Sequence, residues 1–227
     1  MNLFIDIETV PTENETVIQR IADKVSAPGN YKKQESIDKW MAENGEAEKL
    51  AGVAKTGLSG TFGQILCIGW AIDDEPVTVI GRDLDGSEAS VLEAFYLQLV
   101  EKLGRRPERQ LVWIGHNVLK FDLRFIKQRT IVNQVNRRGI DVPADMPAHS
   151  DRIFDTMYQW AGYGGTVSLD DLCLALDIDT PKNGMSGKDV WAYAKEGRYQ
   201  EIEDYCMKDV EAVRSIYNKM TFKGVSS

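Results

Sequence analysis

The stretch Phe4-Ile5-Asp6-Ile7-Glu8-Thr9 decides the fold of this chain. Two carboxylates stand here in an apolar run that predicts a β-strand from Leu3 to Ile7. Because side chains alternate along a strand, Asp6 and Glu8 share one face. Ionised groups in apolar surroundings are costly unless they are paired or bind a cation. The stretch therefore indicates a metal site, with an ordinary pair of strand-edge acids as the alternative.

A further acidic residue follows a second predicted strand, Leu111 to Ile114. That strand ends in Gly115-His116-Asn117, and Asp122 comes five residues after Asn117, in a helix predicted from Leu119 to Arg138. Helix N-termini favour anions, so capping is the alternative to metal binding for Asp122.

The last predicted helix, Arg198 to Met220, carries Tyr205 and Asp209. A spacing of four residues places the phenol and the carboxylate on the same helix face. Taken alone, a packed tyrosine and a solvated aspartate explain this pair better than a catalytic role does.

The remaining pattern predicts an α/β fold with helices packed on a mixed central sheet. Between the first strand and the rest, residues 12–60 are polar and partly helical, and we expect them to form an insertion over the sheet within a single domain, 1–227. The other predicted elements are a hairpin (Gln64 to Ile72 and Val77 to Gly81), a helix (Glu88 to Leu103), a strand (Arg152 to Asp155) and a helix capped at Ser168.

Composition favours a cytoplasmic protein of one domain. The chain has 227 residues, of which 43% are hydrophobic, enough for one sizeable core. It has no apolar run of about 18 residues and no signal-peptide pattern, so we expect no membrane partner. Its three cysteines form no CxxC pair and only two histidines accompany them, which predicts neither disulfides nor a zinc site.

The formal net charge of -8 conceals a strong asymmetry. The segment from Lys102 to Arg138 holds ten basic and two acidic residues. Such a segment suggests a basic face for a polyanion, or simply solvated helix surfaces.

In chain order these pieces read DxE, NxxxFD and YxxxD, with the NxxxFD piece running from Asn117 to Asp122. This order resembles the DEDDy branch of the 3′-to-5′ exonucleases, which belong to the ribonuclease H-like superfamily. The motifs are most similar to the exonuclease domain of family B DNA polymerases and to stand-alone bacterial and phage relatives. The sister DEDDh branch has a histidine five residues before the last acid, where this chain has Asp204. The resemblance runs from Asp6 to about Met220 and implies a ribonuclease H-like fold.

The resemblance also implies a mechanism with two Mg²⁺ or Mn²⁺ ions, which oxygen ligands suit. Asp6 would bridge both ions, Glu8 and Asp209 would complete the first, Asp122 would hold the second, and Tyr205 would position the attacking water. The residues expected to contact substrate are Asn117, Thr9, Phe121 and Lys188. Asn117 could equally be a turn residue, and Lys188 could belong to a solvated loop.

The expected substrate is single-stranded DNA, degraded from its 3′ end to nucleoside 5′-monophosphates, with no small-molecule cofactor. An exoribonuclease of the RNase D kind is the nearest alternative, since nothing in the sequence identifies a residue that senses the 2′-OH. A catalytically silent nucleic-acid-binding protein on the same fold is a third. The sequence identifies no protein partner.

Overall fold

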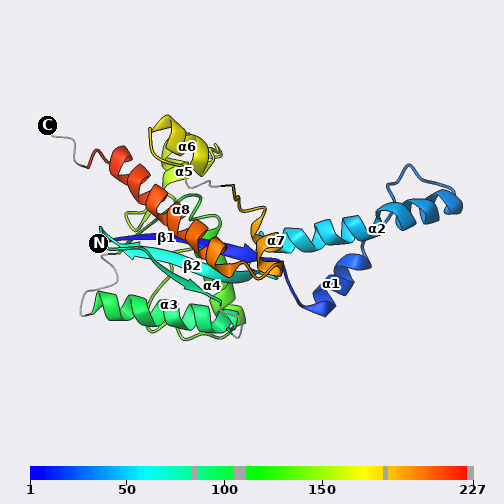
Figure 1. The fold of residues 1–227 in the computed structure, drawn as a ribbon, viewed down its shortest axis with the longest axis horizontal. Coiled ribbons are helices and arrows are strands. Elements are labelled where there is room, and N and C mark those ends of the chain that lie inside the picture. The colour runs from blue at the N-terminus through cyan, green and yellow to red at the C-terminus, as the bar shows by residue number, and fades with distance from the viewer. Residues whose placement is uncertain (83–85, 105–110, 181–183, 224–227) are drawn as a thin grey trace.

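A computed structural model describes residues 1–82, 86–104, 111–180 and 184–223 of the chain. A five-stranded sheet, in the order β3-β2-β1-β4-β5, forms its centre (Figure 1). The strands are β1 (Asn2–Val10), β2 (Gln64–Ile72), β3 (Thr78–Gly81), β4 (Val112–Gly115) and β5 (Ile153–Asp155). Pairing is antiparallel among β1, β2 and β3, and parallel among β1, β4 and β5. The predicted mixed sheet is thereby confirmed.

Helices cover both faces of the sheet. Residues Leu3, Ile5 and Ile7 of β1 pack into a core with α3 (Glu88–Leu103) and α4 (Asp122–Val132). Phe4 points the other way and packs with Val210 and Val213 of α8 (Tyr199–Met220). By the alternation of strand side chains, Asp6 and Glu8 belong to the face that α8 covers.

The strand β1 is longer than the sequence predicted, because its pairing with β2 continues to Val10. An irregularity in register falls between Glu8 and Thr9. Local shifts of this kind bend a strand and change the direction of its side chains.

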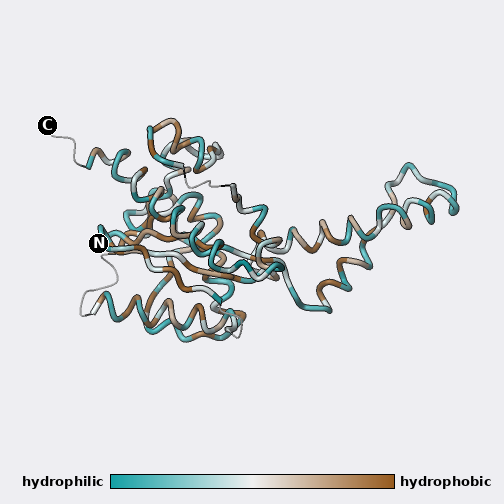
Figure 2. Tube along the Cα trace, in the orientation of Figure 1, coloured by the Kyte–Doolittle hydropathy of each residue, from teal (hydrophilic) through white to brown (hydrophobic). Residues whose placement is uncertain are grey.

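The insertion forms a helical arm of α1 (Glu15–Ala22) and α2 (Gln34–Thr56) that projects beyond the sheet, with a hydrophilic outer part (Figures 1 and 2). The expectation that it lies over the sheet is wrong. The arm connects the paired strand ends Val10 and Gln64, so it leaves at the end of the sheet. Its two helices contact each other, which supplies α1 with a partner away from the core.

Two hydrogen bonds fix the base of the arm to the sheet. The Thr9 hydroxyl donates to the Gly57 carbonyl at 2.8 Å, and the Thr12 main-chain N donates to the Thr56 hydroxyl at 2.9 Å. The base of the arm is therefore anchored directly beside the acidic end of β1.

The shorter helices are α5 (Thr156–Ala161), α6 (Leu169–Ala175) and α7 (Val190–Lys195). Ser168 caps α6 as predicted, since its side chain accepts from the Asp171 main-chain N. Helix α4 ends at Val132 and not at Arg138, and both Gln134 and Arg138 adopt positive φ.

Part of the basic segment serves structural roles. Arg129 is buried and forms an ion pair with the equally buried Glu88, while Lys102 pairs with Glu75. Lys120 and Arg124 are exposed. Arg105, Arg106 and Arg109 lie outside the described residues. Within the part of the chain that the structure covers, no helix has both the length and the apolar character to cross a membrane.

Candidate active site

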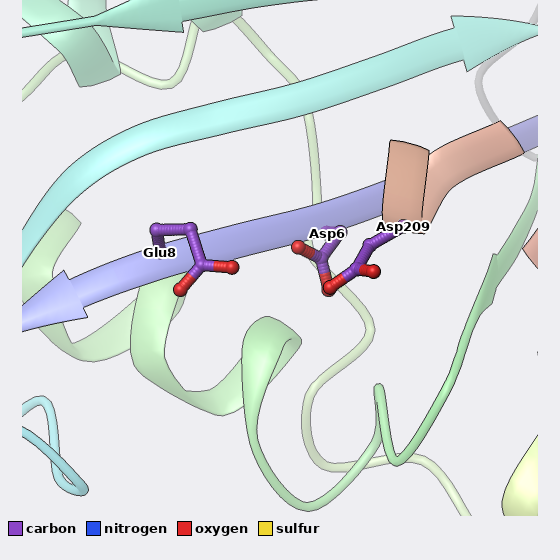
Figure 3. A group of neighbouring side chains, drawn as sticks. All are labelled: Asp6, Glu8 and Asp209. Carbon is purple, nitrogen blue, oxygen red and sulfur yellow. The ribbon is translucent and has the colours of Figure 1, made fainter. Parts of the chain in front are cut away.

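Three carboxylates from distant parts of the chain meet on the α8 face of the sheet. Asp6 and Glu8 come from β1 and Asp209 from α8, and ligand atoms of all three lie within 4.8 Å of one another. Figure 3 shows the Asp6 and Asp209 carboxylates side by side, with Glu8 further along the strand. Glu8 and Asp209 are buried. A cluster of buried carboxylate oxygens suits a hard divalent cation.

A glycine allows α8 to approach the strand closely enough for this meeting. Gly69 of β2 is the register partner of Asp6. A Cβ at position 69 would lie 2.8 Å from the Cys206 sulfur, closer than such atoms can pack. The Cys206 thiol donates to Asp6, with its Sγ atom 3.5 Å from Oδ2. Glycine at 69 therefore sets the distance between Asp6 and the helix that carries Asp209.

Asp122 lies beside the cluster on the other edge of β1. The pairing of β1 with β4 ends at Phe4 and Ile114. The main-chain N–H of Ile7, which lies further along the same edge of β1, is therefore open to another acceptor. Asp122 Oδ1 accepts from this N–H at 3.1 Å. Although Asp122 opens α4, its carboxylate is thus directed at β1. It is not one of the three carboxylates whose ligand atoms lie within 4.8 Å of one another.

Burial and mutual repulsion raise the pKa values of the carboxyl groups in this site. Burial, followed by repulsion from Asp209, raises the pKa of Asp6 well above its usual value. Burial likewise raises the pKa of Glu8, with further contributions from Cys67 and Asp209. Burial raises the pKa of Asp122 to about 8. A bound cation would remove these penalties, because an opposite charge favours the ionised form. The donor set therefore fits divalent metal ions.

Tyr205 lies one helical turn before Asp209 and faces the same cluster. Burial raises the pKa of its phenol far above the usual value, and the charge of Asp209 together with a hydrogen bond to that carboxylate adds to the rise. The phenol therefore stays protonated at neutral pH. It can donate and orient, but it cannot serve as a general base.

The structure places two predicted substrate-binding residues, Thr9 and Lys188, in the wall of one hollow of about 320 Å³. Lys55 and Leu58, from the base of the arm, line the same hollow, and the sequence analysis did not single them out. Nothing in the polar, helix-like pattern of residues 12–60 distinguishes these two from their neighbours. Lys55 and Leu58 come close to Thr9 only because the end of α2 returns to the end of β1.

The other two predicted substrate-binding residues, Asn117 and Phe121, occupy the turn before Asp122. Asn117 has a φ of 58°, and its main-chain N donates to Asp155 at 3.0 Å, which gives it a turn role. It also lines a second hollow, of about 230 Å³. Phe121 packs its ring 5.5 Å from that of Phe125.

The carboxylate of Asp155 organises the backbone around this turn. It accepts from the main-chain N atoms of Asn117, Leu119, Met157 and Tyr158. Asp155 therefore has a structural role at the end of β5. The side chains of Cys67, Cys173 and Cys206 are buried and free.

Comparison with known proteins supports the fold and the chemistry. The family model described as "Predicted 3'-5' exonuclease related to the exonuclease domain of PolB" matches residues 62–224. That match includes Asp122, Tyr205 and Asp209, and β1 lies before it. Among curated proteins none matches the chain.

Among solved structures, the family B DNA polymerase of the hyperthermophilic archaeon Pyrobaculum calidifontis is similar, with a TM-score of 0.57 and 13% identity. The similarity covers 97% of this chain and 24% of the polymerase chain. At this identity the likeness shows the fold, which is the predicted ribonuclease H-like one. The matched family model, which spans most of the chain, shows that it belongs to the predicted 3′-5′ exonucleases related to the exonuclease domain of PolB.

Proposed function

We propose that this chain is a DEDDy-type exonuclease that hydrolyses single-stranded DNA from its 3′ end and uses two Mg²⁺ or Mn²⁺ ions. The observation that carries the proposal is the meeting of Asp6, Glu8 and Asp209 within 4.8 Å. Asp122 and Tyr205 are close enough to this cluster to interact electrostatically with its carboxylates.

The residues divide the reaction between two sides of the scissile phosphate. Asp6, Glu8 and Asp209 would hold one ion and Asp6 with Asp122 the other. When bound, such ions lower the pKa of the attacking water and offset charge on the leaving oxygen. Tyr205, beside Asp209, would orient the water. The attacking water releases a proton to solvent as its oxygen bonds to phosphorus, and the bond to the 3′ oxygen of the preceding nucleotide breaks. That oxygen takes up a proton, and the terminal nucleotide leaves as a 5′-monophosphate.

Digestion of 5′-labelled DNA and RNA oligonucleotides of matched sequence, with Mg²⁺, Mn²⁺ or EDTA, tests the proposal. We expect stepwise shortening of the DNA from its 3′ end, release of mononucleotides, and complete inhibition by EDTA. Shortening of the RNA alone would assign the substrate to RNA. Absence of metal-dependent shortening of either strand would refute the proposed function.

Two variants test the residue roles. Asp209→Asn removes a charge while keeping the shape of the side chain, and should abolish digestion. Tyr205→Phe removes only the phenolic hydroxyl and should reduce kcat less than Asp209→Asn does. The matched control is Asp204→Asn, since Asp204 is an exposed carboxylate on the same helix. Full activity of Asp209→Asn would overturn the site assignment.

A further inference from the structure

The second hollow, about 230 Å³ in volume, lies against the Asp122 side of the site. Asn117, Leu119 and Lys120 form one wall, and they belong to the turn that leads into Asp122. Asp155 also lines the hollow, and its charge contributes to the raised pKa of Asp122. The hollow is therefore continuous with the turn that positions Asp122.

The lining of the hollow also includes a strongly exposed aromatic residue. Tyr163 is 97% exposed and stands in the sequence Gly162-Tyr163-Gly164-Gly165. Gly162 and Gly164 have φ values of 75° and 76°, which other residues rarely adopt. The turn closes through a hydrogen bond from the Gly165 main-chain N to the Gly162 carbonyl at 3.2 Å. Tyr163 therefore stands on a glycine-rich turn that lines the hollow, with its side chain exposed to solvent.

The chemistry of the lining suits a nucleobase. The side chains of Met146, Met157 and Tyr158 provide apolar and aromatic contacts, and exposed Lys120 supplies a positive charge for a phosphate. The carboxylate oxygens of Asp155 already accept from four main-chain N–H groups. The volume is also below the roughly 300–1,000 Å³ typical of pockets that enclose drug-sized ligands. Aromatic rings that stack on bases, beside basic groups that contact the backbone, are the usual means of holding single strands.

We infer that this hollow binds an unpaired base of the retained strand, on the 5′ side of the scissile phosphate, with Tyr163 as its stacking platform. The inference rests on the proposed function. Glu8, Asp209 and Tyr205 face the attacking water in that mechanism, so Asp122 faces the leaving oxygen. The leaving oxygen is the 3′ oxygen of the retained strand. The strand therefore continues past Asp122 toward Asn117 and the hollow.

A base within a duplex is paired and stacked, so it cannot enter the hollow without leaving the helix. The hollow therefore selects for single-stranded 3′ ends. Tyr163 acts on substrate binding and not on bond cleavage. Its removal should raise KM and the dissociation constant, and leave kcat nearly unchanged.

The test compares the wild-type chain with Tyr163→Ala and Tyr163→Phe. Binding of a labelled single-stranded oligonucleotide is measured by fluorescence anisotropy in EDTA, and KM and kcat are measured with Mg²⁺. We expect Tyr163→Ala to weaken binding and raise KM by roughly five- to tenfold, the low end for loss of one stacked base. Tyr163→Phe should bind like the wild type. The matched control is Phe222→Ala, which removes a ring that is 74% exposed near the end of α8.

Oligonucleotides with one abasic position locate the contact. Removal of the base that fills the hollow should weaken binding of the oligonucleotide by the wild type. The same removal should not further weaken binding by Tyr163→Ala. We expect that position to lie on the 5′ side of the scissile phosphate. Unchanged binding by Tyr163→Ala, or additive losses at every abasic position, would overturn the inference. Failure of the wild-type chain to digest any strand would instead refute the proposed function, and the anisotropy series would still decide whether the hollow binds a base.

Discussion

Replacing Asp122 by asparagine should stabilise the metal-free protein at neutral pH, although it removes an expected metal ligand. The amide oxygen of asparagine can still accept from the Ile7 main-chain N, which Asp122 Oδ1 meets at 3.1 Å. The variant therefore changes charge with little change of shape. What it removes is the cost of ionising a buried carboxyl group among other carboxylates.

The magnitude follows from the pKa of Asp122, raised mainly by burial to about 8, against about 3.9 in an unfolded chain. Between these values the folded state binds more protons than the unfolded state, so the free energy of unfolding falls as pH rises. The slope approaches about 1.4 kcal/mol per pH unit, or about 3 kcal/mol from pH 5 to pH 7.5. The free energy of unfolding of Asp122→Asn should not show this fall.

Urea denaturation in EDTA at several pH values measures the effect in the wild type, in Asp122→Asn and in the surface control Asp204→Asn. The wild type and the control should lose stability together as pH rises, and the difference between them and Asp122→Asn should grow. Parallel pH profiles for all three proteins would refute the electrostatic reasoning. So would an Asp122→Asn variant that is less stable than the wild type at pH 7.5.

Three further predictions concern metal binding, helix approach and the buried ion pair. Mn²⁺ at about 100 times its dissociation constant should raise the free energy of unfolding of the wild type by about 2.7 kcal/mol. In a thermal melt, Asp6→Asn should abolish the corresponding rise in melting temperature. Gly69→Ala, which brings a Cβ within 2.8 Å of Cys206 Sγ, should displace α8 and lower kcat by roughly tenfold to a hundredfold. In the control Gly29→Ala the added Cβ meets nothing within 4 Å, so kcat should not change. Equal kcat values for the two variants would contradict the packing argument. Glu88→Ala leaves Arg129 buried without its carboxylate and should destabilise the fold by about 3–5 kcal/mol in urea, whereas a loss below about 1 kcal/mol would show that Arg129 finds another partner.

The sequence predicted the sheet better than it predicted the loops and the arm. Helix Glu88–Leu103 and strand Gln64–Ile72 match the structure at both ends, because their hydrophobic periodicity is strong and their ends are marked. Helix α4 ends six residues before the predicted Arg138 in a region without a clear stop signal. The direction of the arm depends on which strands pair, and this information is not local.

The residues of the candidate site differ in how well the sequence identifies them. Asp6 and Glu8 stand out because carboxylates are rare in apolar strands. Asp122 and Asp209 resemble many helical acids, and only chain order and the family resemblance single them out. Lys55 and Tyr163 could not be identified, because their position near the site depends on how the arm returns and how a glycine-rich turn closes.

The origin of the carboxylates also determines when the chain can first be active. Asp6 and Cys206, which touch in the folded state, are 200 residues apart in sequence. Closing a loop of this length costs entropy that local contacts do not. In the proposed function, a chain in which α8 has not docked on β1 lacks the assembled carboxylates and should not cut nucleic acid. Activity, once present, reports that the last helix has docked on the first strand.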